Sequence, residues 1–212
     1  MKILQGIIQG SPEWKAIRAK CNTASEAPAM MGASKYMTRN ELLKQKATGI
    51  VPEVDAATQR RFGDGHAAEE AARQIAEEII AEELYPATAT NDAGDLLASF
   101  DGITMGENVV FEHKLWNAQL AESVRQVKLD PHYYWQLEQQ LLVSGAEHAL
   151  FMVSDGTKEN CVWMRYDPVP GRAEQLIAGW KQFDEDVKKY QYVEVAPEVV
   201  AHRPVALPAL SV

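Results

Sequence analysis

The sequence predicts an α/β protein whose central mixed β-sheet is flanked by helices, and two observations lead to this prediction. The first third of the chain carries helix-start and helix-stop signals, whereas residues 86–114 change to the two-residue alternation of β-strands. Two helices, a second hairpin and a closing helix follow. Helices that come before, between and after the strands are expected to cover both faces of one sheet.

Three helices are expected in the first 50 residues, each from a local signal. Segment 11–20 opens with Ser-Pro-Glu, which combines a capping residue, a proline at the first helical position and an acid in the first turn. Segment 23–32 opens with Thr-Ala-Ser-Glu and closes at a glycine. Segment 38–49 opens with a Thr-x-x-Glu capping box and also closes at a glycine. The sequence therefore predicts helices over 12–20, 23–32 and 38–49.

A long amphipathic helix, HAAEEAARQIAEEIIAEEL, is predicted after the hinge-like segment 62–65. At about 100° per residue, Glu69 lies within about 80° of the apolar side, whereas the acids at 70, 77 and 78 point away and form a solvated face. An inward carboxylate needs a partner, because burying a lone charge is costly. Two partners are open for Glu69: a metal ion at the sheet, or Arg73 one turn further along the helix.

The middle and the end of the chain alternate between strands and helices. Turn residues separate the runs, and Asp155-Gly156 is a hairpin signal between the last two strands. The predicted strands cover 86–90, 95–101, 107–114, 148–154 and 159–166. The predicted helices between and after them cover 117–127, 131–145 and 171–190. The first three strands are expected to form an antiparallel meander.

Length and composition bound the class of protein. The chain has 212 residues, of which 46% are hydrophobic and 24% charged, and this is enough for one sizeable core. We expect a single domain over residues 1–193 and a mobile C-terminal tail over 194–212, where prolines stand among Ala and Val without a regular period. No apolar run is long enough to span a membrane and the N-terminus lacks a secretion-signal pattern, so we expect a cytoplasmic protein with no membrane partner.

Cysteine content and charge exclude several function classes. Cys21 and Cys161 are too few for a disulfide framework or a four-thiolate iron–sulfur cluster, and two buried thiols are expected. The net charge of −9 argues against broad electrostatic adhesion to nucleic acid. A polyanionic partner would have to be bound through local basic groups or metal ions.

Charged residues converge in the segment SFDGITMGENVVFEHKLW, residues 99–116. Side chains alternate along a strand, so Glu112 and Lys114 project from the same face, and Asp101 ends the neighbouring strand of a short hairpin. Two carboxylates beside a lysine are groups that can hold a divalent metal and activate water for phosphodiester hydrolysis. The alternative is a surface Glu–Lys pair on an edge strand, which the spacing alone does not exclude.

Taken together, these residues resemble the PD-(D/E)XK nucleases, with Glu69 on a helix, Asp101 in SFDG, and Glu112 and Lys114 in FEHK. Three further segments are similar to the family of phage lambda exonuclease and the YqaJ-type viral recombinases. They are GSPEWKAIRAKCNTASEAPAMMG, the helix after Gly65, and YYWQLEQQLLVSG. The resemblance covers about residues 9–190 and implies the restriction-endonuclease-like core of that superfamily.

The resemblance implies a role for each residue of the expected metal site. Asp101, Glu112 and the backbone carbonyl of His113 would hold one Mg²⁺, and Glu69 would share a second with Asp101. Lys114 would orient the attacking water and help to deprotonate it. Two metal ions per site, with Mn²⁺ as a substitute, would stabilise the attacking and leaving oxygens.

Three further residues are matched to roles in the family. Gln136 in YYWQLEQ matches a glutamine near the nucleophile, and Arg18 in WKAIR and Ser25 in TASE match residues that receive the 5′ phosphate of DNA. A serine hydroxyl and N–H groups at a helix start suit an anion without help from the family. Otherwise Gln136 is a polar helix residue, Arg18 a surface arginine and Ser25 a plain helix-start residue.

The chain departs from the family pattern at a few positions. Phe100 stands where the family usually has a proline before Asp101, and His113 stands where an apolar residue is common. Neither change removes a required group, because the implied metal contact at residue 113 is through the backbone. A further basic residue of the phosphate pocket has no obvious counterpart, and Lys35 and Arg39 are the candidates.

The resemblance implies an alkaline-type, Mg²⁺-dependent exonuclease that degrades one strand of linear double-stranded DNA from its 5′ end. It would release 5′ mononucleotides and leave 3′ overhangs for phage-type recombination beside a single-strand annealing protein, in a bacterium carrying the phage or prophage. A homotrimeric ring is also implied, in which an acidic outer surface coexists with a basic channel. Two rivals stay open: an endonuclease, which would cut closed circular DNA, and a catalytically silent subunit that binds DNA ends.

Overall fold

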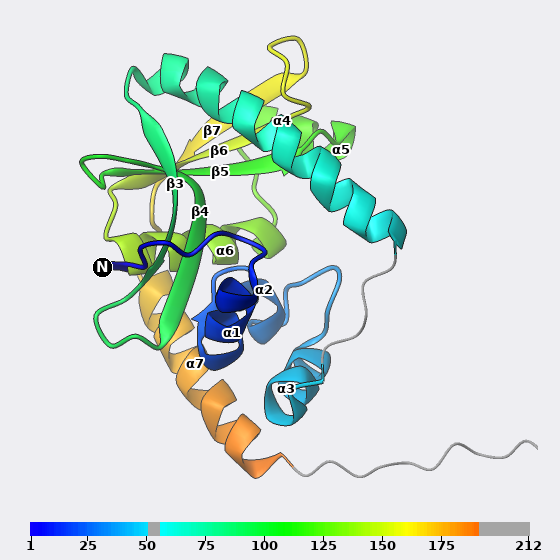
Figure 1. Cartoon of the computed structure of the whole chain (residues 1–212), viewed down its shortest axis with the longest axis vertical. Helices are drawn as coiled ribbons and strands as arrows, with labels where there is room; N and C mark the ends of the chain where they lie inside the picture. The colour runs from blue at the N-terminus through cyan, green and yellow to red at the C-terminus, as the bar shows by residue number, and fades with distance from the viewer. Residues whose placement is uncertain (51–55, 191–212) are drawn as a thin grey trace, which may run out of the picture.

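One mixed β-sheet forms the centre of the molecule (Figure 1). The computed structural model describes residues 1–50 and 56–190, without the side chains of 56–66, so the tail expected over 194–212 lies outside the described residues. In this part of the chain seven strands form the sheet in the order β1-β3-β4-β5-β6-β7, with β2 paired to β4 beside this path. They are β1 (Lys2–Ile3), β2 (Asn22–Thr23), β3 (Leu84–Thr90), β4 (Leu96–Thr104), β5 (Val109–Leu115), β6 (His148–Ser154) and β7 (Cys161–Tyr166).

Helices cover both faces of this sheet, as the sequence predicts. The longest helix, α4, packs against β5 and β6 on one face, whereas α5 and α6 lie on the other (Figure 1). The helix α7 packs against α2, α3 and α6. The helices are α1 (Pro12–Lys20), α2 (Ala27–Met30), α3 (Arg39–Thr48), α4 (Ala56–Ile80), α5 (Ala118–Arg125), α6 (Pro131–Ser144) and α7 (Arg172–Lys189).

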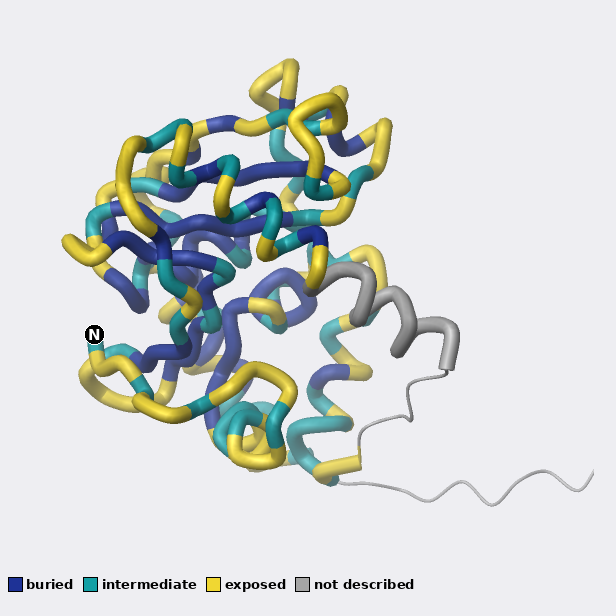
Figure 2. Tube along the Cα trace, turned by 45° about the horizontal axis from the view of Figure 1, so that its top comes forward, coloured by how far each residue is buried: buried dark blue, intermediate teal, exposed yellow. Residues whose placement is uncertain are grey.

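Strand pairing explains why the sheet is mixed. The meander β3-β4-β5 is antiparallel, and β6 and β7 form an antiparallel hairpin. The two units join through β5 and β6, which run parallel because α5 and α6 carry the chain back across the sheet between them. The central strands are buried along most of their length (Figure 2).

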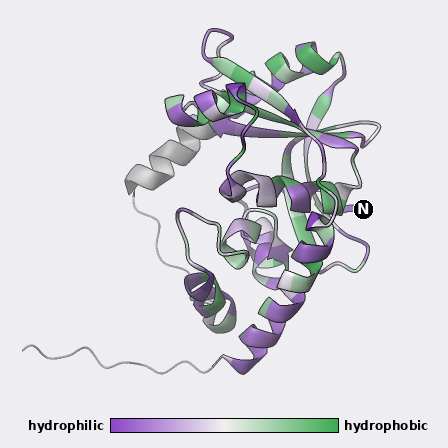
Figure 3. Ribbon diagram, turned by 180° about the vertical axis from the view of Figure 1, so that it is seen from behind, coloured by the Kyte–Doolittle hydropathy of each residue, from purple (hydrophilic) through white to green (hydrophobic). Residues whose placement is uncertain are grey.

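Side-chain alternation along β5 and β6 divides the interior into two hydrophobic cores. The smaller core lies under α4 and the larger core lies among the remaining helices. The division between the two cores can be followed on β5: Val109 and Phe111 belong to the smaller core under α4, whereas Val110 belongs to the larger core. Figure 3 shows hydrophobic residues concentrated on the strands and hydrophilic residues along α7.

Elements with strong local signals lie where the sequence predicts them. Ser11 caps α1 by accepting a backbone N–H, and both halves of the capping box between Thr38 and Glu41 are present. Gly49 and Gly145 end α3 and α6 in left-handed backbone, with φ of 69° and 74°. The strand predicted over 148–154 is β6 without any change of boundary.

Two boundaries in the first half differ from the prediction. The predicted hinge at 62–65 is wrong, because α4 begins at Ala56 and runs through it. Glycines inside a helix cost only about 1 kcal/mol each, and the good helix formers that follow sustain the helix. The second predicted helix begins not at Thr23 but at Ala27, because residues 22–23 pair with β4 as strand β2. Ser25 therefore stands in a turn before a single-turn helix rather than at a helix start.

The meander also differs at its centre. Asp101 does not end its strand, because β4 continues to Thr104. Residues 102–104 continue the strand after Asp101. Asp101 therefore lies inside β4, next to the point where the pairing of β4 with β5 begins. This placement decides the geometry of the candidate site.

Two smaller expectations can be compared with the described residues. Cys21 is buried and Cys161 partly buried, and both are free thiols. Within 1–50 and 56–190 no helix has the length and apolar character needed to cross a membrane.

The first prediction concerns Gly102 of β4, which lies between Leu84 of β3 and Phe111 of β5. A Cβ at this position would stand 3.1 Å from Leu84 Cβ and 3.2 Å from Phe111 Cβ. We expect Gly102→Ala to lower the free energy of unfolding by about 1–3 kcal/mol, because overpacking forces neighbouring groups apart. Urea unfolding of the two proteins measures this, and an unchanged midpoint would show that the strands can yield.

Candidate active site

The strands β4 and β5 separate at Asp101, and this separation forms the site. The two strands pair through only two residues each, and the pair Gly102–Phe111 is the one nearest to Asp101. Beyond it, the N–H of His113 donates to Asp101 Oδ2 at 2.8 Å rather than to a backbone carbonyl. The backbone carbonyl of Asp101 accepts a hydrogen bond from Arg73 Nε at 2.6 Å. Both strands can therefore part with these groups still bonded.

Glu112 lies in the opening between the strands and is held by three side chains. The residue is only 3% exposed. Lys114 Nζ and Gln136 Nε2 donate to Glu112 Oε1 at 2.5 and 2.7 Å, and Gln140 Nε2 donates to Oε2 at 2.6 Å. Lys114 Nζ also donates to Gln136 Oε1 at 3.1 Å. The structure thus brings together the predicted Glu112, Lys114 and Gln136 in one bonded group.

The charges of the site perturb one another. Burial raises the pKa of the Asp101 carboxyl well above its usual range, and the neighbouring carboxylates of Glu112 and Glu69 raise it further. Burial also acts to lower the pKa of Lys114, but attraction to Glu112 and Asp101 outweighs it, so this pKa is raised. Three acids therefore lie near enough to repel, with a protonated lysine among them.

Glu69 faces the sheet, as the helical phase predicts, and it contacts Arg73. The side chain of Glu69 is 17% exposed, and Arg73 Nη2 lies 3.2 Å from Glu69 Oε1. Ala72 and Ala76 on the same side of α4 are fully buried. Since Arg73 also bonds the Asp101 carbonyl, it links α4 to the opening. The partner that the sequence left open is thus Arg73 in this structure.

A cleft of about 500 Å³ borders this side of the site. Glu69 and Arg73 line it, together with Phe100, Thr88 and residues 7–9 of the N-terminal segment. The carboxylate of Glu69 can therefore be approached from solvent through the cleft.

The other acids of α4 only partly follow the predicted solvated face. Glu70 and Glu78 are exposed, and Glu78 pairs with Lys158. Glu77 is partly buried, and its Oε1 accepts the backbone N–H of Leu84 at 2.9 Å. The expectation for Glu77 is wrong because the chain turns back after α4 and presents that N–H to it.

His113 contributes to the site through its backbone. Its ring is buried, with Nε2 3.1 Å from Ser154 O and 3.0 Å from Ser154 Oγ, and burial lowers its pKa to about 4. The N–H and C=O of one strand residue point to the same side. Because the His113 N–H points to Asp101, its carbonyl also faces the opening between β4 and β5.

The donor set fits a hard divalent cation. Mg²⁺ takes oxygen ligands and usually keeps several waters, so one or two carboxylates are enough. Asp101, Glu112 and the His113 carbonyl supply such oxygens, and the repulsion among the acids is what a cation would relieve. Among the side chains that the structure describes, no three His, Cys, Asp or Glu residues form a closed ligand cluster. Glu69 is paired with Arg73 in this structure.

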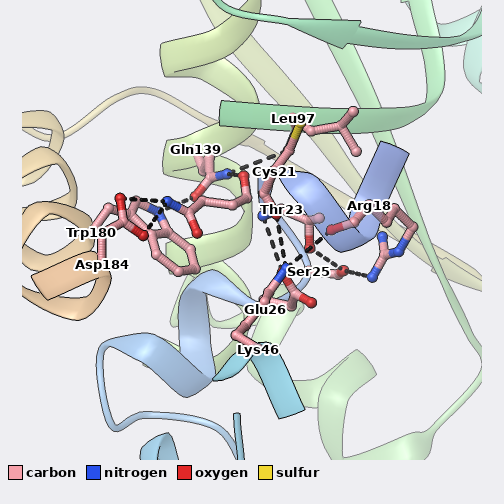
Figure 4. Close-up of polar contacts among 11 residues, drawn as sticks. Arg18, Cys21, Thr23, Ser25, Glu26, Lys46, Leu97, Gln139, Trp180 and Asp184 are labelled. Atoms are coloured by element: carbon pink, nitrogen blue, oxygen red, sulfur yellow. Dashed lines mark hydrogen bonds and ion pairs between the residues drawn. The ribbon is translucent and has the colours of Figure 1, made fainter. Parts of the chain in front are cut away.

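Arg18 and Ser25 meet at a second position (Figure 4). Arg18 Nη2 donates to Ser25 Oγ at 3.0 Å, and Thr23 Oγ1 lies 3.2 Å from the same hydroxyl. Burial lowers the pKa of Arg18, while the nearby Glu26 acts to raise it. A guanidinium and two hydroxyls thus lie side by side, and we call this group of residues the Arg18 pocket (Arg18, Thr23 and Ser25).

Lys46 of α3 braces this pocket. Its Nζ donates to Arg18 O at 3.1 Å and to Cys21 O at 2.8 Å, and lies 2.9 Å from Glu26 Oε2 (Figure 4). Glu26 in turn accepts the N–H of Thr23 at 3.2 Å. The end of α1 and the turn that carries Ser25 are therefore tied to α3.

Strand β2, from which the pocket rises, is held by buried amide groups. Gln139 Nε2 donates to Asn22 O at 2.8 Å, and Trp180 Nε1 donates to Gln139 Oε1 at 2.7 Å (Figure 4). The Asn22 side chain donates to Asp184 of α7 at 3.1 Å. Helices α6 and α7 thus fix the position of β2.

The two candidates for a further basic residue of the pocket are paired elsewhere. Lys35 lies 3.1 Å from Asp130, and Arg39 lies 2.6 Å from Asp186. The basic residue that contacts the pocket's backbone is instead Lys46, which no local pattern singled out.

Sequence reasoning also missed Gln140 and the second contact of Arg73. Gln140 follows Gln136 by four residues, and this spacing places both on one face of α6. That signal could have found Gln140, whereas the contact between Arg73 and the Asp101 carbonyl depends on how α4 crosses the sheet.

The fold and this arrangement define an α/β protein whose mixed sheet, covered by helices on both faces, opens around acids, a lysine and a glutamine. Residues 13–147 match the family model of the YqaJ-like viral recombinase domain. This match spans more than half of the chain, so the chain belongs to that family, as the sequence predicts. No curated protein matches the chain.

Solved structures show the same fold. An alkaline exonuclease from Laribacter hongkongensis, LHK-Exo, has a TM-score of 0.70 and 22% identity, over 84% of this chain and 93% of that one. LHK-Exo in complex with dAMP gives a TM-score of 0.70 and 21% identity over the same shares. A phage-related exonuclease from Haemophilus somnus 129PT has a TM-score of 0.52 and 11% identity, over 80% of this chain and 92% of that one.

The second prediction concerns cation binding by the opening between β4 and β5. We expect Mg²⁺ to raise the thermal midpoint, because a bound cation relieves the repulsion at Asp101. At a hundredfold excess over Kd, binding adds up to about 2.7 kcal/mol to the free energy of unfolding. Glu112→Gln should abolish this shift and Glu70→Gln should keep it. Thermal scans with and without Mg²⁺ measure both, and an equal shift in the two variants would place the cation elsewhere.

Proposed function

We propose that this chain is a Mg²⁺-dependent exonuclease that degrades one strand of linear double-stranded DNA from its 5′ end. It releases 5′ mononucleotides and leaves 3′ single-stranded overhangs. The observation that carries this proposal is the bonded group of Glu112, Lys114 and Gln136 beside Asp101, where β4 and β5 separate. The family, and the structural neighbours that are exonucleases, support it.

Each residue of the opening has a proposed part in hydrolysis. Asp101, Glu112 and the His113 carbonyl would hold one Mg²⁺, and Glu69 with Asp101 would hold a second, with Mn²⁺ as a substitute. When bound, the metal supplies Lewis-acid stabilisation of the phosphate and an activated water. Lys114, fixed by Glu112 and Gln136, orients this water toward the phosphorus.

Polarity comes from the Arg18 pocket. A terminal phosphate carries more negative charge than an internal one, and a guanidinium beside hydroxyls binds it with charge-assisted hydrogen bonds. Since α2 has a single turn, its dipole adds little, and the preference depends on Arg18 and Ser25 themselves.

The proposed setting is phage-type recombination in the bacterial cytoplasm. The chain would act beside a single-strand annealing protein, on double-stranded DNA ends, as a homotrimeric ring. A ring accounts for a net charge of −9 in a DNA enzyme, because a basic channel can lie inside an acidic outer surface. The family resemblance is the support for these partners.

The third prediction tests the reaction itself. Linear duplex labelled at either 5′ or 3′ ends should lose the 5′ label first as mononucleotides, with Mg²⁺ and not with Ca²⁺, whose looser coordination positions water poorly. Lys114→Ala should abolish release, and Glu69→Gln should reduce it by orders of magnitude. Glu70→Gln, on the exposed side of α4, is the matched control and should retain wild-type rates.

Two outcomes would contradict this function. Cutting of closed circular DNA at a comparable rate would indicate an endonuclease. DNA-end binding without hydrolysis in any divalent metal would indicate a silent end-binding subunit.

The fourth prediction concerns the 5′ phosphate. Wild-type protein should start at least roughly tenfold faster on 5′-phosphorylated than on 5′-hydroxyl duplex, because each charge-assisted bond is worth about 1.5–3 kcal/mol. Arg18→Ala should lose most of this preference, and Lys15→Ala, an exposed cation on the same helix, should keep it. Initial rates on the two substrates measure the ratio. If the preference for the 5′-phosphorylated duplex survives in Arg18→Ala, Arg18 does not bind the 5′ phosphate.

A further inference from the structure

Trp14 connects the Arg18 pocket to the sheet. The Arg18 guanidinium carbon lies 4.4 Å from the centroid of the Trp14 ring, a cation–π contact that orients the guanidinium. The indole N–H of Trp14 donates to Ser99 Oγ of β4 at 3.0 Å. One side chain thus touches the phosphate-binding group on one side and a central strand on the other.

Ser99 stands next to the catalytic opening. It precedes Asp101 by two residues on β4, so the two side chains project from the same face, about 6.6 Å apart along the strand. The Ser99 carbonyl accepts Gln140 Nε2 at 3.2 Å, and the same amide donates to Glu112 Oε2 at 2.6 Å. Ser99 therefore lies between Trp14 and both proposed metal-binding acids.

The helix that carries Arg18 lies at the surface of the molecule. None of the residues of α1 is buried. Its end is tied to α3 by Lys46, which bonds Arg18 O, but that contact leads away from β4. At its end α1 leads directly into β2, which pairs with β4 and fixes Thr23 and Ser25. The bond from Trp14 to Ser99 adds a contact from the body of α1, which carries Arg18, to the strand of Asp101.

We propose that Trp14 and Ser99 are positioning residues that hold the Arg18 pocket at a fixed separation from the opening at Asp101, and so set the product length to one nucleotide. This inference rests on the proposed exonuclease function. An enzyme that anchors a terminal phosphate cuts at the phosphate that falls on its metals. The distance between anchor and metals therefore selects which bond is cut, and a loosely held anchor lets the cut fall one nucleotide further along.

Trp14→Phe tests the inference, because it keeps an aromatic face for Arg18 and removes only the N–H that reaches Ser99. The digest of a 5′-phosphorylated duplex is resolved by length. We expect the dinucleotide fraction to rise roughly two- to tenfold, the range that corresponds to one neutral hydrogen bond. Ser99→Ala removes the other half of the same bond, so it should give a similar rise, and the double variant should add little.

A binding measurement accompanies the digest. In Ca²⁺, the ratio of affinities for 5′-phosphorylated and 5′-hydroxyl duplex should fall by a similar factor in Trp14→Phe. Trp163→Phe, at a tryptophan of β7 that is 47% exposed, is the matched control and should leave product length and the affinity ratio unchanged. If Trp14→Phe only lowered the stability of the protein, it would digest DNA more slowly but would not release longer products.

Two results would overturn the inference in distinguishable ways. If Trp14→Phe releases only mononucleotides and keeps the affinity ratio of the control, the spacing does not depend on this bond, although the exonuclease function stands. If the wild type releases no mononucleotides from 5′ ends, the proposed function fails and the inference fails with it.

Discussion

The structure of the site depends on one exchange of hydrogen-bond partners in the middle of a β-sheet. At Asp101 the side-chain carboxylate accepts the N–H of His113, and the backbone carbonyl turns to Arg73. Leaving those groups unpaired inside the protein would cost several kcal/mol, so β4 and β5 could not otherwise part at this point. The exchange opens the sheet between its two faces, which lets groups from α4 and α6 meet there.

Hydrogen bonds to Glu112 explain how the opening tolerates a buried charge. Glu112 is almost fully buried, and a buried carboxylate is stable only if it is bonded on every side. Lys114, Gln136 and Gln140 supply those bonds, and two of them come from one face of α6. Burial, together with the neighbouring carboxylates, nevertheless raises the pKa of Asp101. Repulsion between these carboxylates lowers the stability of the protein at this point, where their oxygens line the opening.

The parts that the sequence predicted correctly are those specified by neighbouring residues. Capping groups and glycines place α1, α3 and α6, and helical phase turns Glu69 toward the sheet. The parts that it missed depend on contacts between distant segments. Strand β2 exists only because β4 lies beside it, and a helical phase cannot decide between Arg73 and a metal as the partner of Glu69, since both lie on the same side of α4.

Arg73 sets the balance of charge at the opening between β4 and β5. It holds Glu69 and the Asp101 carbonyl together, so within the protein two cations, Arg73 and Lys114, face three carboxylates. In the proposed function Glu69 would also hold a divalent ion, so this ion and Arg73 would share the same carboxylate. Arg73 also lines the cleft beside Glu69, where its guanidinium could bind a phosphate of the proposed DNA substrate. In the proposed function, cation binding and phosphate attraction would therefore meet at one arginine on α4.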